Sequence, residues 1–117
     1  FPDYLEFVLA EAQRRDWSTQ AACAAWSSGA YLLETVPSMV WILARHAHDP
    51  EEAIVRAVND THDNDTIAAL VGAAVGALHG KDALPAAWQR GLLGRTTAND
   101  DGRVFRLIEE AVRRNWS

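Results

Sequence analysis

Two adjoining stretches decide the fold: NDTHDNDT at residues 59–66, and IAALVGAAVGAL at residues 67–78. The first contains no aliphatic residue, whereas the second contains only Ile, Leu, Val, Ala and Gly. A helix without a polar face must be surrounded by protein, because water would otherwise contact its apolar side chains. As a helix the second stretch is only about 18 Å long, too short to cross a membrane. We therefore predict a buried, Ala/Gly-rich central helix in a helical bundle.

The rest of the chain also has helical periodicity, and no segment alternates as a strand would. Asp49 is a typical N-cap for the Pro-Glu-Glu sequence that follows it. Ser27-Ser28-Gly29 indicates a break, and Pro37 either begins the regular part of the next helix or kinks it. The further predicted helices span residues 2–15, 33–44, 50–58, 84–93 and 104–112. The predicted fold class is all-α.

Length and composition limit the possible functions. The 117 residues suffice for one domain or part of one. With 11 Lys and Arg against 16 Asp and Glu, the net charge of −5 argues against general nucleic-acid binding and against a membrane partner. The single Cys23 excludes an intrachain disulfide and favours a reducing compartment; its Ala-rich surroundings predict a buried, inert thiol. The start at Phe1, without Met or a signal-peptide pattern, is typical of the middle of a longer chain.

The acidic turn, residues 63–66, is the most informative feature. The carboxylates of Asp63 and Asp65 repel each other beside a dry helix, so something must offset their charge. In one interpretation Asp65 or Thr66 caps the helix by accepting hydrogen bonds from backbone N–H groups. In the other, these oxygens bind a hard cation such as Mg²⁺ or Ca²⁺. The residue pattern alone leaves both interpretations open.

Other metal motifs fit less well. Counting from Asp63, an EF-hand would need Gly at position 68 and Glu at position 74, and both are Ala. One Cys and scattered His residues do not match the usual ligand spacings of zinc. His46 and His48 are expected to be a solvated pair at a helix end.

The run from Ala57 to Ala69 resembles the C-terminal signature of ADP-ribosylglycohydrolases, usually Gly-Gly-Asp-Thr-Asp-Thr-Ile-Ala before a small-residue helix. Leu78-His79-Gly80 and Ala83-Leu84-Pro85, followed by Trp88, continue the resemblance in order. The glycine-led segment, residues 29–37, resembles the family segment that runs into Ser-Val-Pro. The similarity covers residues 29–94 and suggests the dinitrogenase-reductase-activating glycohydrolase type.

The resemblance implies an orthogonal all-α bundle with two Mg²⁺ ions, sometimes Mn²⁺. Asp63, Asp65 and Thr66 match residues that supply half of the metal shell, and the residue matching Asp65 commonly touches both ions. A Thr-Asp-Asp motif in the N-terminal half of the family supplies the remaining ligands. The chain has no Thr-Asp-Asp, so residues 1–117 are interpreted as the C-terminal portion of a single domain or as one chain of a split enzyme.

The resemblance also implies ligand-binding residues. Gly29 and Ala30 match a segment that lies along bound ADP-ribose. Tyr31 could join that lining, although a lone Tyr on a helix is commonly a core residue. Thr61-His62 replaces the usual Gly-Gly, which directs attention to His62 as a residue facing the ligand.

The implied function is Mg²⁺-dependent hydrolysis of the glycosidic bond between ADP-ribose and an acceptor such as an ADP-ribosylated protein side chain. The catalytic acid is expected in the N-terminal part, which would be an obligatory partner. A cytoplasmic location agrees with the intracellular occurrence of the family. Two alternatives stay open: a catalytically silent ADP-ribose-binding relative, and a helical interaction module whose acidic turn only caps a helix. The sequence does not specify the acceptor: Arg, Ser, a nucleic-acid end or a small molecule.

Overall fold

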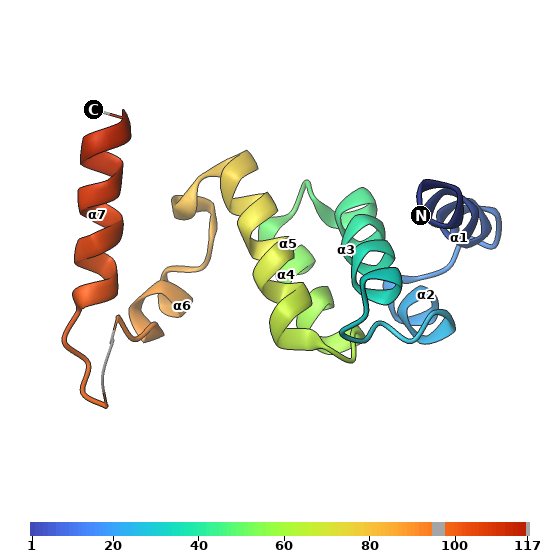
Figure 1. The fold of residues 1–117 in the computed structure, drawn as a ribbon, viewed down its shortest axis with the longest axis horizontal. Coiled ribbons are helices and arrows are strands. Elements are labelled where there is room, and N and C mark those ends of the chain that lie inside the picture. Colours follow the sequence, from blue (N-terminus) through green and yellow to red (C-terminus); the bar gives the residue numbers. More distant parts are fainter. Residues whose placement is uncertain (95–97, 117) are drawn as a thin grey trace. The chain divides into compact units, whose positions relative to one another are not determined.

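Helices account for all the regular secondary structure in the described part of the chain, which in this computed structural model is residues 1–94 and 98–116. The all-α prediction is therefore confirmed. The elements are α1 (Pro2–Arg14), α2 (Thr19–Ala25), α3 (Leu32–His46), α4 (Pro50–Asp60), α5 (Asn64–His79), the 3₁₀ turn η1 (Lys81–Ala83), α6 (Ala86–Gly91) and α7 (Arg103–Trp116) (Figure 1).

Local capping explains where two of these helices begin. Asp49 Oδ1 accepts a hydrogen bond from Glu52 N at 3.1 Å, and Pro50 occupies the first turn of α4, as predicted. Ser18 Oγ accepts one from Ala21 N at 3.1 Å and begins α2. The sequence did not predict α2, because its run of small residues lacks aliphatic periodicity. Its N-cap serine was the one available local signal.

The chain forms two compact units, residues 1–85 and residues 86–117, and each is described separately. In the first unit, α4 and α5 form a helical hairpin that packs against α3, and the α3 residues Pro37 and Ile42 are buried. Pro37 lies inside α3, so the helix begins well before it. The main core comes from α2 to α5: Cys23, Ile42, Ala53, Ala57, Ile67, Val71 and Val75.

A smaller core fixes α1 and α2 to α3. It consists of Ala12, Ala22, Trp26 and Trp41. Trp26 Nε1 donates a 2.8 Å hydrogen bond to Ser38 Oγ inside this region. Because Trp26 follows α2 directly, this anchor determines where the chain emerges into the loop at residues 27–31.

The helix α5 is buried along one face only. Ile67, Val71 and Val75, spaced four apart, are fully buried against α3 and α4. Leu70 is 41% and Leu78 66% exposed, so the described residues of the first unit do not give α5 the expected burial on every side. Among the described residues, no helix is long and apolar enough to span a membrane.

The second unit contains α6 and α7. Gly94 is buried against the Phe105 ring, where an added Cβ would lie 2.2 Å from the ring. Gly94 also accepts a backbone hydrogen bond from Val104 at 2.9 Å, which fixes the start of α7. The apolar residues of α7 are exposed: Val104, Phe105, Leu107, Ile108, Val112 and Trp116.

Candidate functional site at the turn between α4 and α5

The turn between α4 and α5 is short and well bonded. Thr61 is buried and donates its hydroxyl hydrogen to Ala57 O, one helical turn back. Its φ of −113° and ψ of 156° are ordinary extended values. Asp63, with φ of −87°, also avoids the left-handed region. His62 is likewise not among the residues with a positive φ. The turn therefore does not need glycine at positions 61 and 62, which explains how Thr61-His62 replaces the family's usual Gly-Gly.

Ser28 joins the loop after α2 to this turn. Its carbonyl oxygen accepts hydrogen bonds from His62 N at 3.2 Å and from Asp63 N at 3.0 Å. Its hydroxyl oxygen accepts from His62 N at 3.0 Å. These bonds bring together residues 34 positions apart. Figure 1 shows the loop between α2 and α3 beside the α4–α5 turn.

Two side chains of α3 hold Gly29, the first residue of the glycine-led segment. Gly29 N donates to Glu34 Oε2 at 2.9 Å, and Thr35 Oγ1 donates to Gly29 O at 2.8 Å. A Cβ on Gly29 would lie 2.3 Å from Glu34 Oε2, so a larger residue would displace the Glu34 carboxylate from this position. The sequence analysis missed Glu34 and Thr35 in this role, because nothing in the local pattern shows which way they face.

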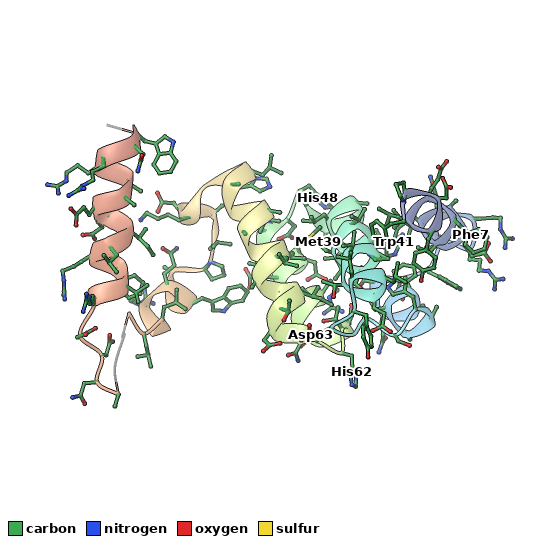
Figure 2. All side chains as sticks on the ribbon, in the orientation of Figure 1. Phe7, Met39, Trp41, His48, His62 and Asp63 are labelled. Atoms are coloured by element: carbon green, nitrogen blue, oxygen red, sulfur yellow. The ribbon has the colours of Figure 1, made fainter. Side chains whose placement is uncertain are left out.

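The predicted ligand-binding residues are accessible. Ala30 is exposed, and Tyr31, at the N-cap position of α3, is 77% exposed. The alternative of Tyr31 as a core residue is therefore wrong. His62 is also exposed, and Figure 2 shows its side chain pointing away from the helices, next to Asp63. The structure thus places residues from both candidate segments at the same end of the first unit.

The oxygens of the acidic turn take little part in capping. Asp63 occupies the N-cap position of α5, but its side chain makes no capping hydrogen bond. Asp65 Oδ1 accepts from the adjacent Thr66 N at 2.9 Å, which is the one feature of the capping interpretation that is present. Both Asp65 and Thr66 are exposed, and Asp63 is half-buried. Most carboxylate oxygen lone pairs here remain available for a ligand.

Asp63, Asp65 and Thr66 have side chains of the types that bind magnesium in proteins. Carboxylate and hydroxyl oxygens are ligands that Mg²⁺ and Mn²⁺ prefer, and the N-terminal end of α5 carries both. In the described ranges, however, no three His, Cys, Asp or Glu side chains come close enough to hold a metal ion. Within the described residues, the acidic turn alone therefore does not form a metal site.

His46 and His48, expected to be a solvated pair, are not equally exposed. His48 is exposed, but His46 is half-buried, and burial lowers its pKa below the ordinary value. It belongs to no metal-binding group within the described residues.

An open hollow of about 550 Å³ lies beside the turn, between the ends of α2 and α4. Ser28, Asp60 and His62 contribute to its wall, together with Cys23. Burial raises the pKa of the Cys23 thiol to about 11, with a smaller contribution from the Asp60 charge, so this thiol is protonated and inert at neutral pH. The prediction of a buried, inert cysteine agrees with this position.

Asp60, which the sequence analysis passed over, is a structural carboxylate. Its side chain is only 5% exposed. It accepts a hydrogen bond from the Thr19 hydroxyl and lies 3.5 Å from Arg56 Nη1. Asp60 thus joins the end of α4 to the start of α2. Although it lies near the candidate site, its carboxylate is already bonded to Thr19 and Arg56.

In the described residues, the turn between two antiparallel helices thus carries acidic and hydroxyl side chains beside the glycine-led segment. The family model of the ADP-ribosylglycohydrolases matches residues 3–115, so the chain belongs to the ADP-ribosylglycohydrolase family. This match extends well beyond residues 29–94, where the resemblance was recognised. No curated protein and no solved structure matches the chain significantly.

Proposed function

We propose that this protein is a Mg²⁺-dependent hydrolase of the bond between ADP-ribose and an acceptor, of the dinitrogenase-reductase-activating glycohydrolase type. Membership of the family supports glycohydrolase activity in general. The single observation that carries the finer proposal is the state of Asp63 and Asp65. Their carboxylates are largely free of capping bonds, and they lie next to a segment that Ser28 holds against the same turn.

Each residue of the site then has a stated role. Asp63, Asp65 and Thr66 would hold a metal pair from one side, with Asp65 as the proposed common ligand. A bound Mg²⁺ pair would orient the ribose hydroxyls and activate a water for attack. Gly29, Ala30 and Tyr31 border the ADP-ribose, and His62 faces it from the turn. Mn²⁺ is expected to replace Mg²⁺, because both prefer oxygen ligands.

The remaining parts of the site are assigned outside residues 1–117. The proposed partner is an N-terminal portion of the same enzyme, which would supply the other metal ligands and the catalytic acid. We place this enzyme in the cytoplasm. The exposed apolar side chains of α5, among them Leu70 and Leu78, are available to such a portion.

A silent ADP-ribose-binding relative is the second candidate. It is favoured by the fact that the described residues contain no complete group of three metal ligands. Such a protein would bind ADP-ribose through Gly29 to Tyr31 without hydrolysis. The helical interaction module is the third alternative, and it predicts binding of neither Mg²⁺ nor ADP-ribose.

The test uses the full-length protein with peptides ADP-ribosylated on Arg or on Ser, and follows release of free ADP-ribose. We expect release that requires Mg²⁺, stops with EDTA and returns with added Mg²⁺ or Mn²⁺. ADP-ribose binding without release would instead support the silent relative. Absence of both binding and release would contradict the proposed function and leave the interaction module.

A further inference from the structure

Ser28 is a buried loop residue that makes several hydrogen bonds to the turn between α4 and α5. It is 4% exposed, and its carbonyl and hydroxyl oxygens together accept three hydrogen bonds from the amides of His62 and Asp63. These amides precede the first turn of α5, where helix N–H groups lack intrahelical partners. A single residue therefore satisfies the N–H groups of both His62 and Asp63, where the acidic turn begins.

The backbone of this loop adopts conformations that L-residues rarely take. Ser27 has φ of 72° and Ser28 has φ of 27°, whereas the φ of the adjacent Gly29 is not in the left-handed region. Such conformations cost about 1–2 kcal/mol for a residue with a Cβ. Glycine at position 28 would avoid that cost. A serine here is explained if its hydroxyl, bonded to His62 N, contributes something that glycine could not.

The position of Ser28 in the chain suggests what that contribution is. The residue after it is Gly29, which Glu34 and Thr35 hold from the other side. Asp63, whose amide is bonded to Ser28, is the first acid of the acidic turn. Ser28 thus stands between the two segments of the candidate site and fixes their separation.

We propose that Ser28 is a positioning residue that holds the glycine-led segment against the acidic turn, so that both segments contact one ADP-ribose. This inference rests on the proposed function. Ser28 contacts neither ligand nor metal itself in this proposal. It acts through the backbone of Gly29 and Asp63, and its loss loosens the ligand site without removing any ligand-binding side chain.

The experiment compares Ser28→Gly, Ser28→Ala and the matched control Ser27→Gly in the full-length protein. Both glycine variants relieve a positive φ, but only the Ser28 variants lose a bonded hydroxyl, since the Ser27 side chain is exposed. Calorimetry measures ADP-ribose affinity with Mg²⁺ present, and thermal unfolding measures stability. We expect about five- to tenfold weaker ADP-ribose binding for both Ser28 variants, equivalent to one hydrogen bond. The melting temperature of Ser28→Gly should not fall, and Ser27→Gly should bind as the wild type does.

Amide hydrogen exchange of the ligand-free protein gives a second, ligand-independent measurement. The His62 amide should exchange faster in Ser28→Ala than in the wild type, and equally slowly in Ser27→Gly. Wild-type affinity in both Ser28 variants would overturn the positioning role while leaving the proposed function intact. Equal loss in Ser27→Gly, or a loss of affinity that only parallels a fall in melting temperature, would overturn it as well. No ADP-ribose binding by the wild type would overturn the proposed function and this inference with it.

Discussion

Asp60 and Asp65 lie on either side of one turn, yet their carboxylates have opposite surroundings. The Asp60 side chain is 5% exposed and has partners on two helices, Thr19 of α2 and Arg56 of α4. Asp65 is exposed, and its carboxylate accepts a hydrogen bond from the neighbouring Thr66 N. Both acids belong to the same run of polar residues, so polarity alone does not separate a carboxylate that has protein partners from one that is largely free. The number of partners that each carboxylate already has separates them.

The largest expected effect is that of Asp65→Asn. Asn keeps the shape and caps helices well, so the helix should still form. It brings no charge to offset two dications, and turnover should therefore fall by more than about 100-fold, since even residues that only support metal ligands are worth 10–100-fold. Mg²⁺ titration and release of ADP-ribose by the full-length protein measure the effect.

Asp60→Asn is the control for this substitution. It makes the same chemical change five residues away, where the carboxylate already has protein partners, and should leave Mg²⁺ affinity unchanged. Wild-type Mg²⁺ affinity and turnover in Asp65→Asn would remove Asp65 from the metal site and restore the capping interpretation.

The second largest effect concerns the free energy of unfolding. Here substitution of Asp60 should have a larger effect than substitution of Asp65. Asp60→Ala leaves the Thr19 hydroxyl without its acceptor and removes one of two acidic partners of Arg56, which keeps Glu52. We expect the free energy of unfolding to fall by about 2 kcal/mol. This is below the 3–5 kcal/mol typical of a fully buried pair, because the Arg56 side chain is 32% exposed. Urea unfolding provides the measurement. Asp65→Ala should change stability less, and an equal loss in both variants would erase the distinction between the two acids.

The smallest of the three effects concerns the other segment of the site. In Gly29→Val the new side chain displaces the Glu34 carboxylate and breaks its bond to Gly29 N. We expect ADP-ribose affinity to fall about tenfold, roughly the value of one hydrogen bond to a charged group, with Mg²⁺ affinity unchanged. Gly76→Val is the control, since a Cβ there meets no atom within 4 Å. Unchanged ADP-ribose affinity by calorimetry would exclude the glycine-led segment from the site.

Prediction from sequence was most successful where periodicity or a cap is strong. The start of α4 at Pro50 was predicted from Asp49 and its neighbours. The helix predicted for residues 67–78 exists, but α5 begins earlier, at Asn64, so Asp65 and Thr66 belong to its first turn. The apolar run marks where burial is needed, whereas the backbone becomes helical before that need begins. The helix was therefore predicted correctly, but its predicted start at Ile67 lies three residues after the observed start at Asn64.

The site was predictable only in its separate parts. The sequence identified the acidic turn and the glycine-led segment by their resemblance to a family, and the match over residues 3–115 confirms that family. It did not identify Ser28, Glu34 or Thr35, which join these parts and hold them in place. Hydrogen bonds between distant residues leave no local pattern, because the donors and acceptors involved are common to every loop.

The amino-acid sequence by itself determined the helical class and the oxygen-rich end of α5, because both follow from the spacing of residue types along the chain. The tertiary structure decided which acids are already paired, which face of α5 is buried, and that Ser28 joins the two candidate segments. Pairing depends on neighbours that α2 and the loop after it bring from more than 30 residues away. Those neighbours exist only after the helices have packed.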